Sequence, residues 1–71
     1  YHKTFLEYLT DLRIEKAKSL LSTTDFKLYE IAERSGYADS HYFSVIFKKH
    51  TGMTPKDYRN EKHEIHEKHS L

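Results

Sequence analysis

Side chains that can form hydrogen bonds or bind anions gather on one face of a helix expected over residues 39–50: Ser40, His41, Ser44, Lys48 and Lys49, with Val45 flanking them. At 100° per residue, this face lies opposite an apolar one. Short polar side chains near the start of a helix can reach base edges in a DNA major groove, and cations farther along can contact phosphates. Val45 would press on a thymine methyl group there. The alternative is an ordinary surface helix that exposes one valine and a solvated histidine.

The same stretch also contains the residues that should hold this helix. Its apolar face is expected in the core, with Phe43, Ile46 and Phe47, and beside them Tyr42. Asp39 is the best N-cap, because its carboxylate can accept hydrogen bonds from first-turn N–H groups. As a cap, Asp39 is expected to be structural and not to read a base. Gly52 should end the helix.

A shorter helix is expected before it, over about residues 27–35, with Thr24 or Asp25 as the N-cap. Its inward side would carry Leu28, Ile31 and Ala32. Gly36 then supplies the left-handed conformation that often ends a helix, and Tyr37 should anchor the turn from below. The sequence therefore predicts a short helix, a break at Gly36 and a second helix.

A long helix should precede this unit and run to about Ser22, starting from the capping box formed by Thr4 and Glu7. Its apolar positions change face midway: Phe5, Tyr8, Leu9 and Leu12 form one stripe, and Ile14, Ala17 and Leu21 form another. Two stripes indicate two partners, so the first would be exposed unless another chain covers it. The alternative is an overwound helix with one partner. Arg13 lies between the stripes and could brace a carboxylate such as Asp11 or Glu15 or contact a phosphate; the structural role is favoured.

The last helix is expected to start at Thr54 as N-cap and Pro55 as first residue. Tyr58 should enter the core, whereas Lys56 and Arg59 could reach the DNA backbone. Base contacts are therefore predicted for Ser40, His41, Ser44 and Val45, and phosphate contacts for Lys48, Lys49, Lys56 and Arg59. Beyond Asn60, a polar tail should fray. It carries His63, His66 and His69, but adventitious metal capture is favoured over a native site.

Composition narrows the class of protein. With 71 residues and no cysteine, the chain has room for one small domain without disulfides, which agrees with a reducing cytoplasm. Nothing resembles a membrane span or a signal peptide. The net charge is +1, yet residues 37–60 hold four Lys/Arg against two Asp/Glu, which suits local phosphate contact. No catalytic constellation or phosphate-binding glycine loop is present, so neither an enzyme nor a cofactor is expected.

The chain resembles the C-terminal part of the AraC/XylS family DNA-binding domain over roughly residues 4–60. The resemblance rests on a multi-position pattern: Arg13-Ile14, Ala17, Leu20-Leu21, Thr24-Asp25, Ile31-Ala32, Gly36-Tyr37, Asp39, Tyr42-Phe43-Ser44, Phe47-Lys48-Lys49, Gly52, Thr54-Pro55 and Tyr58-Arg59. It implies an all-α fold in which a linker helix (1–24) precedes the second helix-turn-helix unit (25–60) and a polar tail (61–71). The first unit of the family would precede Tyr1.

The resemblance also implies a function. A bacterial, cytoplasmic transcription regulator would bind double-stranded DNA through the helix at 39–50, and such regulators often activate transcription by contacting RNA polymerase. A single unit should bind weakly. The alternative hypothesis is a protein-interaction module that self-associates through the exposed linker-helix stripe, Phe5, Tyr8, Leu9 and Leu12.

Overall fold

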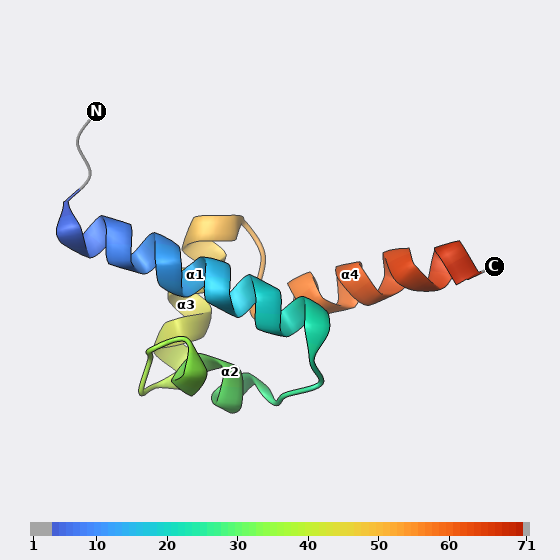
Figure 1. The fold of residues 1–71 in the computed structure, drawn as a ribbon, viewed down its shortest axis with the longest axis horizontal. Coiled ribbons are helices and arrows are strands. Elements are labelled where there is room, and N and C mark those ends of the chain that lie inside the picture. The colour runs from blue at the N-terminus through green and yellow to red at the C-terminus, as the bar shows by residue number, and fades with distance from the viewer. Residues whose placement is uncertain (1–3, 71) are drawn as a thin grey trace.

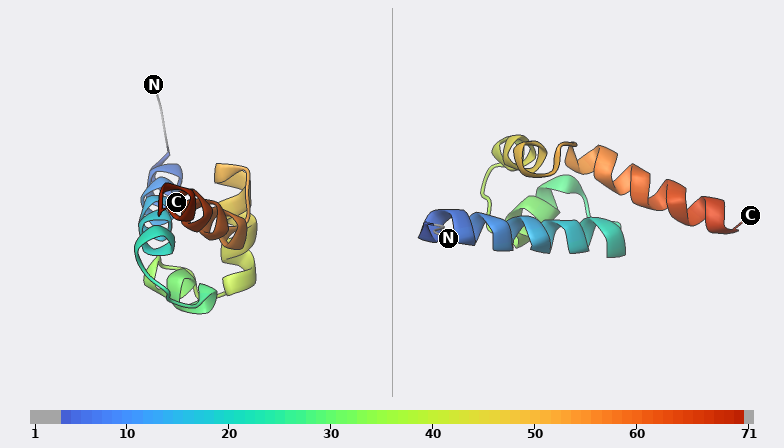
Figure 2. Two further views of the ribbon diagram at one scale, coloured as in Figure 1. Left: turned by 90° about the vertical axis from the view of Figure 1, so that its right-hand side faces the viewer. Right: turned by 90° about the horizontal axis from the view of Figure 1, so that it is seen from above.

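The computed structural model describes the backbone of residues 4–70 and the side chains of residues 4–62. In this range the chain forms α1 (Phe5–Thr23), α2 (Leu28–Arg34), α3 (Ser40–Thr51) and α4 (Pro55–Ser70), without a strand. The all-α prediction is confirmed. α1 runs the length of the helix-turn-helix formed by α2 and α3, and α4 leads away from it at the far end (Figure 1). Figure 2 shows α3 and the start of α4 lying together on one side of α1.

α1 begins as its sequence predicts and changes face midway. The Thr4 N–H donates to Glu7 Oε1 at 2.8 Å, and the Glu7 N–H donates to Thr4 Oγ1 at 3.1 Å. In the second half of the helix, Ile14, Ala17 and Leu21 are buried. In the first half, apolar side chains are exposed, with Phe5 at 78%. The predicted exposure of the first stripe is therefore confirmed, although Leu9 is half-buried.

The core lies between the second half of α1 and the three following helices. Its fully buried large side chains include Leu21, Ile31, Phe43 and Phe47. Aromatic rings continue through it, because Phe47 lies 5.8 Å from Phe43 and 5.5 Å from the ring of Tyr58. Burial of these apolar surfaces supplies the main driving force for packing α3 against the rest.

The start of α2 differs from the prediction that Thr24 or Asp25 caps it. Its N-cap is Lys27, whose backbone N–H donates to the Glu30 side chain at 2.9 Å. Thr24 instead closes α1, since its Oγ1 donates to the Leu20 carbonyl at 2.6 Å. The backbone is extended at Thr24 and again at Lys27, so the next helical turn begins only at Leu28.

The turn between α2 and α3 is a Schellman motif. The N–H of Gly36 donates to the Glu33 carbonyl at 3.1 Å, and the N–H of Tyr37 donates to the Ala32 carbonyl at 2.8 Å. Gly36 has φ +102°, a backbone conformation that glycine adopts without steric cost. This motif determines where the chain turns toward α3.

The fourth helix starts as predicted but continues farther. Thr54 Oγ1 accepts a hydrogen bond from the Asp57 N–H at 3.1 Å, and Pro55 is buried at the first helical position. The backbone is helical to Ser70. None of the described helices combines the length and the apolar character needed to cross a bilayer.

Candidate nucleic-acid interface

The N-terminus of α3 is held by Asp39. Its Oδ1 accepts hydrogen bonds from the backbone N–H groups of His41 at 2.8 Å and Tyr42 at 3.4 Å, which confirms the predicted cap. The carboxylate is thus engaged with the first turn, where it also offsets the positive end of the helix dipole. The side chains that follow Asp39 are presented from a fixed helix start.

The predicted base-contacting side chains occupy the first two turns of α3. His41 is exposed, Val45 is 52% exposed, and Ser40 and Ser44 are half-buried. The Ser44 Oγ donates to the Ser40 carbonyl at 3.0 Å. Because the Ser44 hydroxyl proton is used within the helix, the oxygen can still accept a hydrogen bond from outside. This face therefore offers the accessible imidazole of His41, the methyl groups of Val45 and the Ser44 hydroxyl oxygen as an acceptor.

Three of the four predicted phosphate-contacting cations are exposed. Lys48 and Lys49 lie in the last turn of α3, and Lys56 lies in the first turn of α4. Gly52, at φ +87°, ends α3 just after the two lysines, so the chain turns away before α4 begins. Lysine ammonium groups on flexible stems can follow a phosphate backbone on either side of a groove.

Arg59 is different, because its guanidinium is used inside the protein. Nε donates to the Leu21 carbonyl at 3.3 Å, Nη1 to the Phe26 carbonyl at 2.7 Å, and Nη2 to the Thr24 carbonyl at 3.0 Å. Each nitrogen therefore has a carbonyl partner at the end of α1 or in the connection after it. These contacts indicate a structural role for Arg59 in place of the predicted phosphate contact.

The prediction for Tyr42 was wrong. This residue was expected in the core but is 54% exposed, and its ring meets Tyr37 edge-on with centroids 5.9 Å apart. At 100° per residue, position 42 falls at the border between the apolar and polar faces of α3. This border position was the one feature of the sequence that could have indicated its exposure. Phe43, by contrast, is fully buried as predicted.

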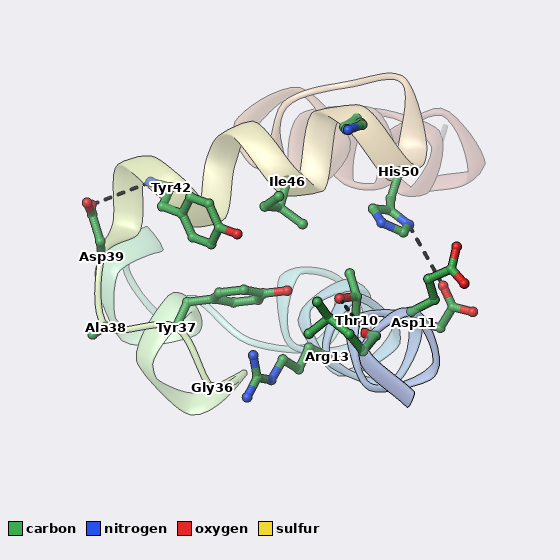
Figure 3. A pocket seen from close by; sticks show the side chains of 13 residues that line it. Thr10, Asp11, Arg13, Gly36, Tyr37, Ala38, Asp39, Tyr42, Ile46 and His50 are labelled. Carbon is green, nitrogen blue, oxygen red and sulfur yellow. Dashed lines mark hydrogen bonds and ion pairs between the residues drawn. The ribbon is translucent and has the colours of Figure 1, made fainter. Parts of the chain in front are cut away.

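Arg13 does not brace Asp11 or Glu15. The carboxylate of Glu15 pairs with Lys18 at 3.1 Å, and Asp11 Oδ1 lies 3.8 Å from His50 Nδ1. The guanidinium of Arg13 lies over the Tyr37 ring, 5.2 Å from its centroid (Figure 3). Arg13 is structural, as expected, but its partner is the turn between α2 and α3.

An open groove of about 860 Å³ separates the first half of α1 from the turn and from α3. Its lining combines apolar and charged side chains, including Asp11, Arg13, Tyr37, Tyr42, Ile46 and His50 (Figure 3). Among the described residues, no group of three or more His, Asp or Glu is placed to hold a metal ion. The side chains of His63, His66 and His69 lie outside the described residues.

Comparisons with known proteins agree with this geometry. A family model described as a helix-turn-helix domain matches residues 1–61. The chain is 44% identical over 59 residues to the uncharacterized HTH-type transcriptional regulator YijO of Escherichia coli K12. It is 46% identical over 52 residues to the HTH-type transcriptional activator RhaR of Yersinia pseudotuberculosis. These matches cover 83% and 73% of this chain, but 21% and 18% of the relatives.

A solved structure extends the likeness to three dimensions. The C-terminal domain of the two-component response regulator yesN from Fusobacterium nucleatum is 53% identical, with a TM-score of 0.80. The match covers 80% of this chain and 55% of that domain. The chain thus spans about a fifth of the curated relatives it matches and about half of the solved domain.

Proposed function

Because this chain belongs to the AraC-type helix-turn-helix family of transcription regulators, we propose that it binds double-stranded DNA by inserting α3 into the major groove. The observation that carries the proposal is the exposed polar face of α3, opposite the buried Phe43 and Phe47. The family consists of DNA-binding regulators and not enzymes. Such a regulator acts where the bacterial genome lies, in the cytoplasm.

Base edges are read by Ser40, His41, Ser44 and Val45 in this proposal. His41 donates to a guanine acceptor, and Val45 packs on a thymine methyl group. The Ser44 oxygen accepts from an exocyclic amine of adenine or cytosine, because its proton already goes to the Ser40 carbonyl. These three side chains lie within the first two turns of one helix face, so they would read neighbouring base pairs.

Phosphates are contacted by Lys48, Lys49 and Lys56. Their ammonium groups set the register of α3 on the duplex and carry no sequence information themselves. With three such contacts, affinity should be modest and should fall steeply with salt. A regulator that pairs this unit with a second one would gain affinity through linkage. We further propose that the whole regulator activates transcription by contacting RNA polymerase.

Fluorescence anisotropy at about 50 mM salt and above tests the proposal. The probes are a duplex selected from a random pool against this chain and a scrambled duplex of equal composition. Lys48→Ala should reduce the slope of log K against log salt by about 1. Ser44→Ala should reduce only the preference between the duplexes, by about five- to tenfold, because it removes a base contact.

Lys16→Ala is the matched control, since Lys16 is an exposed lysine on α1. It should leave both the salt slope and the duplex preference unchanged. Equal affinity for the two duplexes would contradict base reading by α3. Equal effects of Lys16→Ala and Lys48→Ala would contradict the phosphate assignment.

A second candidate function is self-association through the first half of α1. Phe5, Tyr8 and Leu12 are 78%, 55% and 49% exposed, an unusual concentration of apolar surface for one short stretch of helix. Half-buried Leu9 lies beside them. Sedimentation equilibrium over a hundredfold range of protein concentration tests this candidate, because self-association should raise the apparent mass with concentration. A constant monomer mass would count against this candidate.

A further inference from the structure

The side chain of Arg13 connects α1 to the turn of the helix-turn-helix. Its guanidinium carbon lies 5.2 Å from the centre of the Tyr37 ring, within the range of a cation–π contact. A Cβ atom built on Gly36 would lie 2.9 Å from Arg13 Nε and 3.4 Å from Cδ and Cζ. The arginine therefore packs directly on the backbone of the turn, in space that glycine leaves open.

Tyr37 connects Arg13 to α3. Its side chain is buried, with 7% exposure, and its ring lies 5.9 Å from Tyr42 and 5.7 Å from Phe43 on α3. Its hydroxyl is buried and has no hydrogen-bond partner among the described residues, so Tyr37 contacts its neighbours through the aromatic ring. Figure 3 shows Tyr37 lying between Arg13 and Tyr42.

The contact between Arg13 and Tyr37 lies on the buried side of α3. Phe43 and Tyr37 face the core, whereas His41 and Val45 face outward. A guanidinium packed on Tyr37 thus lies behind the helix that would enter DNA. Arg13 can influence the outward face only through the position of the turn and of the first turn of α3.

We propose that Arg13 is a positioning residue for DNA recognition: its guanidinium holds the turn from Gly36 to Asp39, and through Tyr37 it orients the N-terminal turn of α3. This inference rests on the proposed function of α3. The planar guanidinium can stack on the ring and on the turn backbone at once, which a lysine ammonium cannot. A lysine at position 13 should therefore fail to replace it.

Amide hydrogen exchange tests the placement without DNA. The reporters are the N–H groups of Tyr37 and Phe43, which donate to the Ala32 and Asp39 carbonyls. Arg13→Met should reduce protection at both by about three- to tenfold, the range of a cation–π contact. The Gly52 N–H, which donates to the Lys48 carbonyl at the other end of α3, should change less. Lys16→Met is the matched control on α1.

Arg13→Lys shows which property of the arginine matters. If Arg13→Lys lowers amide protection at Tyr37 and Phe43 as much as Arg13→Met does, stacking of the planar guanidinium is supported. Restoration of protection by lysine would overturn the proposal, because charge alone would then suffice. Equal loss at Tyr37, Phe43 and Gly52 would also overturn it, since Arg13 would then only stabilise the fold as a whole.

The DNA readout uses the selected and scrambled duplexes with the same variants. Arg13→Met should lower the preference for the selected duplex by about three- to tenfold and leave the salt slope unchanged, because no phosphate contact is lost. Tyr37→Phe should keep the preference, whereas Tyr37→Leu should lower it as Arg13→Met does. If the wild-type chain shows no preference, the proposed function fails. If it shows one that Arg13→Met does not alter, only the positioning role fails.

Discussion

Arg59 Nη1 donates a 2.7 Å hydrogen bond to the carbonyl oxygen of Phe26, a residue 33 positions earlier in the chain. The other two nitrogens reach Leu21 and Thr24. One side chain of α4 thus satisfies the carbonyl groups where α1 ends and the connection to α2 begins. Helix ends leave such carbonyls without intrahelical partners, so an arginine is well suited to this position.

Arg59→Lys should lower the free energy of unfolding by about 2–4 kcal/mol, because one ammonium group cannot replace three fixed N–H donors on partly buried carbonyls. Urea denaturation followed by circular dichroism measures this change. The salt slope of DNA binding, determined at a temperature where the variant is folded, should stay at the wild-type value. A lower slope with unchanged stability would restore Arg59 to the phosphate contacts.

Gly36→Ala should destabilise the protein more than Gly52→Ala. Both glycines have positive φ, so alanine would be strained at either position, by about 1–3 kcal/mol. At position 36 the new Cβ would also meet Arg13, 2.9 Å away, whereas at position 52 no described residue other than the chain neighbours comes within 4 Å.

The difference between the two glycine variants should shrink when Arg13→Ala is added to both, as a double-mutant cycle by thermal denaturation would show. An unchanged difference would mean that Arg13 does not pack on the turn.

Asp39→Ala should cost about 1 kcal/mol of stability through loss of the α3 cap. Asp25→Ala is the matched control, because Asp25 is an exposed aspartate that precedes α2 without capping it. Its effect on the free energy of unfolding should stay within about 0.5 kcal/mol. Similar losses for both variants would place a second cap at Asp25 after all.

Lys18→Ala should change stability by less than about 0.5 kcal/mol, although Lys18 and Glu15 form a 3.1 Å ion pair. The pair lies within one helix turn, and Glu15 is largely exposed, so water and salt screen the attraction. Chemical denaturation at low and at high salt is the appropriate measurement. A loss above 1 kcal/mol at low salt would show that the pair contributes more than an exposed contact.

The sequence by itself determined where most helices begin and end. The Thr4 and Glu7 capping box, the Asp39 cap and the glycine stops at 36 and 52 act over three or four residues, so their signals are local. The division of α1 into two apolar stripes was also visible, because helical periodicity reports which face is buried.

The tertiary structure alone decided the roles of the ambiguous side chains. An arginine can bind a phosphate, a carboxylate, an aromatic ring or backbone carbonyls, and residue type does not distinguish among them. The partners of Arg59 lie 33–38 residues away, and Arg13 meets a turn 23 residues farther along the chain. Tyr42 lies at the border of the two faces of α3, so the exposure of its side chain depended on the angle at which that helix packs. Such long-range placements depend on how the helices pack, which local sequence patterns do not encode.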